Sequence, residues 1–460
     1  MILMKFGGTS VKDPAAVRRL VGIVRARQRP VVVVSALSKV TDGLIGITAL
    51  AEKGDAAAAG EAVRALHERH RQMCELVSEP RRRSQLLAEI DELFADLSSI
   101  VHALAVIEEV SPRSADTIVA FGELASSRIV AAALEDAGVR ARFVDARRVL
   151  VTDAQHGAAQ PDRQETEERL QALVAPAVAE GVVPVLGGFI GSTANGVTTT
   201  LGRGGSDYSA ALFGAALSAE EIQIWTDVDG MLTADPRVVA SPRVVRSLSF
   251  DEASELAYFG AKVLHPSTIL PAVGLGIPVR ILNAQRPEAE GTLITATVER
   301  SGDAPAAIAC KRGLTRIDIA SSRMLMAYGF LRRVFEVFER FRTSVDVVTT
   351  SEVSVSVTID DRRALEAIVA ELTAFADVSS EDGMAIVCAV GESLHEDARL
   401  ATRVLGALEG LPLAMVSQGG SRKNITVVLR DGDVKEAMER LHRRFFEEEG
   451  RPESATVTGA

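Results

Sequence analysis

The stretch LGRGGSDYSA, residues 201–210, places a fixed cation and a fixed anion inside one glycine-rich turn. Turns of this kind before a helix often hold phosphate, because bare backbone N–H groups can approach the oxygens. This turn matches neither GxGxxG nor GxxxxGK[ST], the two common phosphate-binding patterns. The question is which ligand needs both the cation of Arg203 and the anion of Asp207 in one tight turn.

The segment KFGGTS places Lys5 at the end of an expected strand and Gly7 and Gly8 in the turn that follows. Ligands of α/β sheets bind at the carboxyl ends of the strands, so the lysine and the glycine N–H groups can meet a phosphate together. The alternative is a surface lysine beside an ordinary tight turn. This segment alone does not separate the two interpretations.

Two further segments offer hydroxyl and carboxylate groups. SALSKVTDGL contains Ser35 and Thr41, which either hydrogen-bond a small polar ligand or cap the following helix. FGELASS contains Glu123, which either recognises a ligand ammonium or complements a helix dipole.

The segment TDVDGMLTADPR follows the strand that carries the single tryptophan, Trp225. Its aspartates lack the EF-hand ligand at position five and the terminal glutamate, so a calcium loop is not indicated. We interpret Thr226, Asp227 and Arg237 as groups around a nucleotide. FGAKVLHP adds Lys262 in a helix-like stretch that ends before a proline.

These residues are carried by alternating strands and helices in residues 1–300, which predict an α/β domain with a mainly parallel sheet. Asp13 and Pro14 predict the cap and the first position of a helix. Residues 55–110 predict a helical hairpin. The expected buried strands are apolar on both faces and cover residues 2–6, 30–36, 181–191, 221–230 and 277–283.

Beyond a linker at 299–305, the pattern changes to two units of about 70 residues with the same order of elements. Residues 312–382 predict strand, helix, two strands, helix and strand, as in a ferredoxin-like module. Residues 383–460 repeat this order and predict a second module. The strand at 306–310 is left over and is assigned to the second module as one possibility.

The composition is that of an ordinary soluble protein, with 460 residues, 47% hydrophobic and 25% charged. A net charge of −11 argues against a nucleic-acid partner, and an anionic substrate must meet locally concentrated cations. No secretory signal and no run of 18 apolar residues is present, which predicts a cytoplasmic protein without a membrane partner. Three separate cysteines without CxxC, and histidines without HExxH, indicate no metal site.

Taken together and in this order, KFGGTS, FGE, TTTLGRGGSDYSA, TDVDG…TADPR and FGAKVLHPSTILPA resemble the aspartokinases. The resemblance covers essentially the whole chain. It implies an amino-acid-kinase-like three-layer α/β domain followed by two ferredoxin-like βαββαβ modules of the ACT type. The chain resembles the monofunctional members, since it ends where a homoserine dehydrogenase would begin in the bifunctional ones.

The reaction implied by this resemblance is transfer of the ATP γ-phosphoryl group to the β-carboxylate of L-aspartate. The product, 4-phospho-L-aspartate, leads towards lysine, threonine and methionine. A carboxylate is already nucleophilic at neutral pH, so catalysis consists of positioning and charge neutralisation. The implied cofactor is ATP with Mg²⁺, the metal being held mainly by phosphates and water.

The resemblance also gives each candidate residue a role. Lys5 and Asp207 form the catalytic set, in which Asp207 holds the cations in place. Arg203 grips the aspartate α-carboxylate through its planar fork. The aspartate-binding set is Ser35, Thr41, Glu123 and Arg203, with Glu123 facing the ammonium. The ATP-binding set is Lys5, Gly7, Gly8, Thr226, Asp227, Leu232, Arg237 and Lys262. Leu232 replaces a tyrosine that many members place near the adenine, so aromatic stacking is lost there.

The segments MLMAYGFLRRVFEVF and SVDVVTTSEVSVS resemble the first ACT module of lysine-inhibited members. They imply control by lysine, with threonine control or no control as alternatives. ACT pockets of this family usually form between paired subunits, which implies a homodimer or a dimer of dimers. The implied pocket residues, otherwise ordinary turn and sheet-edge residues, are Met324, Gly329, Phe330, Leu331, Ser344, Val345, Asp346, Ser351 and Glu352.

Two other functions are compatible with parts of the sequence. One keeps the fold and phosphorylates acetylglutamate or another acidic small molecule, although an acylated amine leaves Glu123 without an ammonium partner. The other is a catalytically inactive amino-acid sensor, which the intact Lys5, Arg203, Asp207 and Lys262 argue against.

Overall fold

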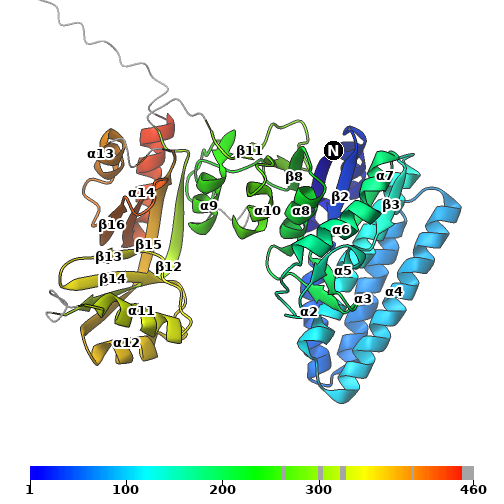
Figure 1. The fold of residues 1–460 in the computed structure, drawn as a ribbon, viewed down its shortest axis with the longest axis horizontal. Coiled ribbons are helices and arrows are strands. Elements are labelled where there is room, and N and C mark those ends of the chain that lie inside the picture. The colour runs from blue at the N-terminus through cyan, green and yellow to red at the C-terminus, as the bar shows by residue number, and fades with distance from the viewer. Residues whose placement is uncertain (261–265, 299–303, 322–327, 393, 395–397, 448–460) are drawn as a thin grey trace, which may run out of the picture. The chain divides into compact units, whose positions relative to one another are not determined.

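The computed structural model describes residues 1–260, 266–298, 304–321, 328–392, 394 and 398–447 (Figure 1). The chain divides into two compact units. Unit 1 comprises Met1–Met231 and Val263–Thr297, and unit 2 comprises Leu232–Lys262 and Val298–Ala460. Unit 1 thus ends near the expected boundary at residue 300, but Leu232–Lys262 belongs with the C-terminal modules.

Unit 1 is built on a mainly parallel sheet with the strand order β3-β5-β2-β1-β8-β10-β11. Its strands are β1 (Ile2–Phe6), β2 (Pro30–Val34), β3 (Ala141–Val144), β5 (Val183–Gly187), β8 (Glu221–Thr226), β10 (Val279–Asn283) and β11 (Thr292–Thr295). Only the β10–β11 pair in this series is antiparallel. The strand β2 is buried along its whole length, as expected for a parallel sheet covered on both faces. The predicted α/β class is confirmed.

Helices cover both faces of this sheet. Met4 and Phe6 of β1 share a core with Val17 of α1 (Pro14–Arg25) and Ile129 of α5 (Pro112–Asp136). On the other face, α8 (Gly205–Ala216) contacts β1, β2 and β8. The helix α1 begins as predicted, because the Asp13 carboxylate accepts a hydrogen bond from the Ala16 N–H at 2.8 Å.

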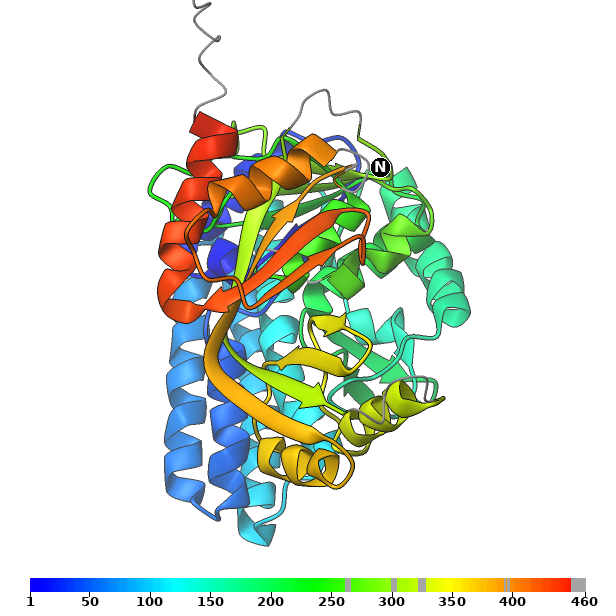
Figure 2. The ribbon, with the colours of Figure 1, turned by 90° about the vertical axis from the view of Figure 1, so that its left-hand side faces the viewer.

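The expected helical hairpin is formed by α3 (Ala56–Cys74) and α4 (Pro80–Ile107), which lie side by side (Figures 1 and 2). The other helices of unit 1 are α2 (Val40–Glu52), α6 (Arg163–Leu173), α7 (Ala175–Ala179) and α10 (Leu270–Val273). Among the described residues, α5 is the one helix long and apolar enough to cross a membrane. Its most apolar window is 89% buried, so it serves as a core helix of unit 1.

The run expected as one strand at 181–191 is instead two strands in different sheets. β5 stays in the main sheet, while β6 (Ile190–Thr193) joins a small sheet with β4 (Val151–Thr152) and β7 (Thr198–Thr200). The chain turns between them, where Phe189 has a φ of 64°. At Gly188 an added Cβ would lie 2.8 Å from the Ser206 Cα, so this turn packs directly against the start of α8.

Unit 2 contains one antiparallel sheet with the order β13-β14-β12-β15-β17-β16. Its central strands, β12 (Ala307–Ala320) and β15 (Asp377–Val390), run side by side through both modules (Figure 2). Their register shifts between Lys311 and Leu314, next to Gly313 with a φ of 75°. This irregularity divides each of the two strands into a half that belongs to the first module and a half that belongs to the second.

The first module adds α11 (Phe330–Arg340), β13 (Val348–Thr350), β14 (Ser354–Ile359) and α12 (Leu365–Thr373). The second adds α13 (Ala398–Ala407), β16 (Met415–Gln418), β17 (Asn424–Arg430) and α14 (Val434–His442). The strand that the sequence left over is the start of β12, and residues 307–311 pair with residues 386–390 of β15. Unit 2 also contains β9 (Ser247–Ser249) and α9 (Phe250–Tyr258).

Candidate active site

A cavity of about 690 Å³ opens in unit 1 beyond the carboxyl ends of β1, β2 and β5. This is the edge where ligands bind in α/β sheets. The residues predicted for catalysis and for aspartate binding all line it: Lys5, Ser35, Thr41, Glu123, Arg203 and Asp207. Their side chains come from four separate segments of the sequence, which the fold brings to one place.

Lys5 and Asp207 form an ion pair at this cavity, with 2.6 Å between Nζ and Oδ1. Lys5 lies near the end of β1, and Asp207 lies in the first turn of α8. An acidic residue is favourable there, because the helix N-terminus carries partial positive charge. Both side chains are largely buried, at 11% and 16% exposure, so the lysine ammonium is held at a fixed point.

Arg203 projects from the glycine turn that precedes α8. Its neighbours Gly202 and Gly204 have φ values of 76° and 72°, a left-handed backbone that glycine adopts without strain. The guanidinium is exposed and has no hydrogen-bond or ion-pair partner among the described residues. It is therefore available to an anion that enters the cavity.

Glu123 lies in the middle of α5, so the alternative of a helix-dipole role is wrong. Its side chain is buried, and Oε1 accepts a hydrogen bond from the Ala36 N–H at 3.1 Å. Within the described residues Oε2 has no partner. Burial raises the pKa of this carboxyl to about 8. An ammonium group beside Oε2 would pair with it and favour the ionised form.

The capping alternative for Ser35 and Thr41 is also wrong. The helix α2 has Lys39 as its N-cap, with a φ of 65° and no side-chain cap. Ser35 instead follows β2, and Thr41 lies in the first turn of α2, where both residues line the cavity. Their hydroxyl groups are placed to hydrogen-bond a polar ligand.

The predicted ATP-binding residues are divided between the two units. Gly7 follows β1, and Thr226 is the last residue of the neighbouring strand β8. The Gly7 N–H donates to the Trp225 carbonyl at 3.1 Å. Gly8 lies beside Gly7, and Asp227 accepts a hydrogen bond from the Thr226 hydroxyl. Leu232 and Arg237 belong to unit 2. Arg237 is exposed and paired with Asp235, and Lys262 lies outside the described residues.

Most of the predicted effector residues lie in the first module. Gly329 caps α11 with a φ of 80°, and Leu331 is exposed in the first turn of this helix. Phe330 is buried and packs edge-on against Phe375, so it is a core residue. Ser351 and Glu352 are exposed in the turn between β13 and β14, and Ser344 and Val345 precede β13. Met324 lies outside the described residues.

Asp346 is different from the other predicted effector residues, because its carboxylate is only 2% exposed and already paired. It contacts the Lys311 ammonium at 2.7 Å and accepts a hydrogen bond from the Tyr258 hydroxyl at 3.0 Å. Lys311 also contacts Asp360 at 2.7 Å. Burial, together with the negative charge of Asp346, raises the pKa of Tyr258 to about 12.

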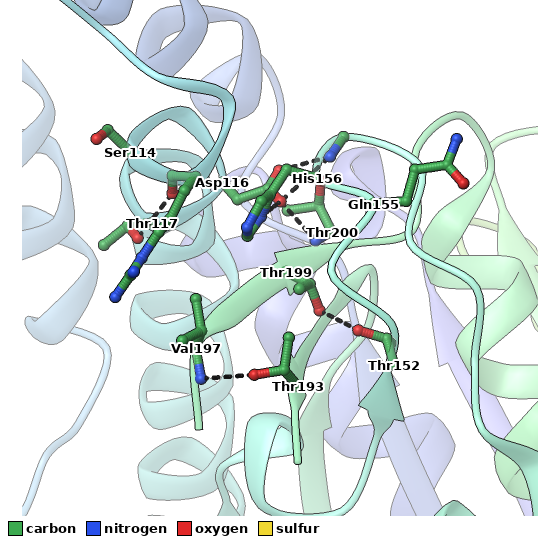
Figure 3. Close-up of polar contacts among 12 residues, drawn as sticks. Ser114, Asp116, Thr117, Thr152, Gln155, His156, Thr193, Val197, Thr199 and Thr200 are labelled. Carbon is green, nitrogen blue, oxygen red and sulfur yellow. Dashed lines mark hydrogen bonds and ion pairs between the residues drawn. The ribbon is translucent and has the colours of Figure 1, made fainter. Parts of the chain in front are cut away.

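One cavity residue, Asp116, was missed by the sequence analysis. It lies on α5 two helical turns before Glu123 and receives hydrogen bonds from His156 and Thr200 (Figure 3). The seven-residue spacing, which places both carboxylates on one face of a helix, was the available signal.

Comparison with known proteins places this chain in a family. The model of the amino acid kinase family matches residues 1–283, and an ACT domain model matches residues 387–445. The chain is 36% identical over 456 residues to the lysine-sensitive aspartokinase 3 of Escherichia coli, covering 97% of this chain and 99% of that protein. The chain belongs to the aspartokinase family.

A second aspartokinase, chloroplastic aspartokinase 1 of Arabidopsis thaliana, is 38% identical over 471 residues, covering 97% of this chain and 80% of that protein. The fold is shared as well. The crystal structure of E. coli aspartokinase III in complex with aspartate and ADP matches with a TM-score of 0.81 and 36% identity. That match covers 97% of this chain and 100% of the solved chain. The expected family and fold are confirmed.

Proposed function

We propose that this aspartokinase transfers the γ-phosphoryl group of ATP to the β-carboxylate of L-aspartate, giving 4-phospho-L-aspartate. The observation that carries the proposal is one cavity with a fixed Lys5–Asp207 pair, a buried carboxylate on Glu123, and an Arg203 guanidinium that has no partner in the described part of the chain. A zwitterionic acceptor and a phosphoryl donor need this combination of charges. The E. coli relative crystallised with aspartate and ADP supports both substrates.

In the proposed reaction the aspartate β-carboxylate attacks the γ-phosphorus. An O–P bond forms to the carboxylate, the bond between the γ-phosphorus and the bridging oxygen breaks, and ADP leaves. The carboxylate is ionised at neutral pH, so the step needs no general base. Lys5 neutralises charge on the transferred group, and Asp207 keeps the ammonium aimed at the cavity. The N–H groups at the start of α8 offer further positive potential.

The aspartate is held at the end opposite its reacting β-carboxylate. Arg203 pairs with the α-carboxylate, Glu123 pairs with the α-ammonium, and Ser35 and Thr41 donate or accept hydrogen bonds at the sides. Two opposite charges at fixed positions orient the molecule, so that its β-carboxylate points towards Lys5. Such orientation supplies much of the rate in phosphoryl transfer.

We further propose that Mg²⁺ enters with ATP. Among the described residues, no group of three or more His, Cys, Asp or Glu side chains is arranged to hold a metal ion. The proposed ligands are therefore phosphate oxygens and water. The remainder of the nucleotide site is proposed to comprise Gly7, Gly8, Thr226, Asp227, Leu232, Arg237 and Lys262.

We propose that lysine inhibits the enzyme through the ACT modules. The lysine-sensitive E. coli relative supports this effector. The pocket is proposed to form between the first modules of two subunits in a homodimer or a dimer of dimers, where Asp346 and Glu352 meet the ammonium groups of the effector. A cytoplasmic location is part of the same proposal.

The test is to incubate purified protein with ATP, Mg²⁺ and L-aspartate and to trap the acyl phosphate with hydroxylamine. The expected product is aspartate hydroxamate, with none from N-acetyl-L-glutamate. Hydroxamate from acetylglutamate but not from aspartate would contradict the proposed acceptor. Loss of product on addition of millimolar lysine is expected, and a rate indifferent to lysine would contradict the effector alone.

A further inference from the structure

Asp116 is a buried carboxylate in unit 1 that receives hydrogen bonds from four groups. Its side chain lies beside the cavity on α5, and the residue is only 3% exposed. Oδ1 accepts from the Thr200 hydroxyl at 2.6 Å, and Oδ2 accepts from His156 Nδ1 at 2.7 Å. The backbone N–H groups of Gly157 and Thr200 donate to Oδ2 at 3.1 and 3.3 Å. Both oxygens are thus fully used within the protein.

The donors belong to two segments that are far apart in the sequence. His156 and Gly157 lie in the loop after β4, whereas Thr200 is the last residue of β7. The two segments also contact each other directly, because the Ala159 N–H donates to the Thr200 carbonyl at 2.9 Å. At Gly202 an added Cβ would lie 2.9 Å from the Gly157 carbonyl oxygen. Asp116 therefore ties the loop and the end of β7 to α5.

Arg203 follows Thr200 by three residues. Its guanidinium has no partner among the described residues, so no side-chain contact fixes its direction. The two flanking glycines have left-handed φ values; Gly202 packs closely on the Gly157 carbonyl, and the Gly204 carbonyl accepts from the Asp207 N–H at 3.0 Å at the start of α8. The backbone that carries Arg203 is therefore held by α8 on its C-terminal side, and by Thr200 and Gly157 on its N-terminal side.

We infer that Asp116 is a positioning residue for the acceptor: by fixing Thr200 and Gly157, it sets the turn from which Arg203 reaches the aspartate α-carboxylate. The inference rests on the proposed role of Arg203. Asp116 does not contact the substrate itself, because its oxygens are occupied by His156, Gly157 and Thr200. Its effect on the reaction passes through the backbone of the turn.

The test compares the Michaelis constants for aspartate and ATP in several variants of the full-length enzyme. Asp116→Asn keeps the shape of the side chain but replaces one acceptor oxygen with an NH₂ donor. This donor would face the N–H and O–H donors that now bond Asp116. Thr200→Val removes the hydroxyl donor and keeps the volume. We expect each to raise the KM for aspartate about tenfold, as for loss of one hydrogen bond to a charged group, and to leave the KM for ATP within about twofold.

The chain offers a matched control on the same strand. The Thr199 hydroxyl bonds to the Thr152 hydroxyl at 2.6 Å, in the small sheet beneath the turn (Figure 3). Thr199→Val is expected to lower the melting temperature without raising the KM for aspartate. Thr200→Ser keeps the hydroxyl and is expected to restore the KM that Thr200→Val raises.

A double-mutant cycle separates positioning from a general loss of structure. In an Arg203→Ala background, Asp116→Asn is expected to raise the KM for aspartate no further, since the group it positions is gone. Each of three results would overturn this inference alone. The first is the same tenfold rise in the Arg203→Ala background, and the second is an equal rise in the Michaelis constants for aspartate and ATP. The third is an unchanged KM for aspartate in Asp116→Asn. An unchanged KM for aspartate in Arg203→Ala itself would contradict the proposed function, and this inference with it.

Discussion

Two lysine–aspartate pairs, one in each unit, have nearly the same geometry but different surroundings. Lys5 and Asp207 are 2.6 Å apart at a cavity, next to an unpaired guanidinium and an unpaired carboxylate oxygen. Lys311 and Asp346 are 2.7 Å apart; Lys311 also pairs with Asp360, and the Tyr258 hydroxyl donates to the same Asp346 oxygen, Oδ1. The other oxygen, Oδ2, is buried and has no hydrogen-bond partner among the described residues. The first pair faces space for a ligand, whereas in the second pair Lys311 and Asp346 Oδ1 already have further protein partners.

This difference separates a preformed site from one that needs a rearrangement. A substrate entering the cavity of unit 1 meets the Lys5–Asp207 pair and the Arg203 guanidinium already in place. An effector ammonium that bonds Oδ1 of Asp346 must first displace Lys311 from a side chain that is 2% exposed. Such competition is a direct way to couple effector binding to a change of state, because the two states then differ in their contacts.

The largest effect is expected from removing the lysine of the pair at the cavity. Lys5→Met should lower kcat by about 1,000-fold, as for loss of a group that stabilises charge in the transition state. The matched control is Lys311→Met, which removes the lysine of the second pair and should leave kcat without effector within about twofold. Steady-state assays of hydroxamate formation measure both. Equal losses of kcat in the two variants would contradict the difference in role between the two pairs.

A second large effect is expected from pH, through Glu123. Its pKa is raised to about 8, so the free enzyme carries this group mainly protonated at pH 7. Binding of the aspartate ammonium requires the ionised form, and the ionised fraction falls about tenfold per pH unit below the pKa. The KM for aspartate should therefore rise as pH falls from 8 to 6 and level off above 8. The control, Glu123→Gln, should have a higher KM with a flat pH profile. A wild-type KM that does not change over this range would contradict the role of the carboxylate.

A several-fold effect is expected on inhibition. Lys311→Met removes the group that an effector ammonium has to displace from Asp346, so the lysine concentration for half-inhibition should fall. Arg312→Met is the control, because Arg312 pairs with Asp431 at 3.6 Å, away from this network. Melting temperatures identify any variant that fails to fold. Weaker inhibition in a folded Lys311→Met enzyme would rule out competition for Asp346.

The smallest effect is expected far from both pairs. Asp13→Ala removes the cap of α1 and should lower the free energy of unfolding by about 1 kcal/mol. Denaturant unfolding measures this change, and the Michaelis constants and the inhibition by lysine should not move. A changed KM for aspartate would mean that α1 influences the cavity.

Much of this architecture could be predicted from the sequence, because local patterns specify it. The runs ILMKF and PVVVV are apolar on both faces, which fits only covered strands, and Asp13 with Pro14 specifies a helix start. The candidate site was predicted because lysine, arginine and glutamate stood at strand ends or beside glycines. Each of these signals lies within about ten residues of sequence.

Other features depend on contacts between distant segments and have no local signal. The break between β5 and β6 follows from close packing of Gly188 on Ser206. It cannot be recognised in the sequence, because residues 181–191 form one continuous apolar run. The sharing of β12 and β15 between the two modules follows from strand pairing over about 70 residues of sequence separation. Asp116 was missed because its partners, His156 and Thr200, lie elsewhere in the chain.

The central claim is that the cavity of unit 1 recognises aspartate as a zwitterion through Arg203 and Glu123. Calorimetric titration of L-aspartate into the wild-type enzyme, Arg203→Ala and Glu123→Gln at pH 8.5 tests it most directly. We expect one aspartate per chain in the wild type and at least about tenfold weaker binding in each variant. Wild-type affinity in both variants would contradict the claim.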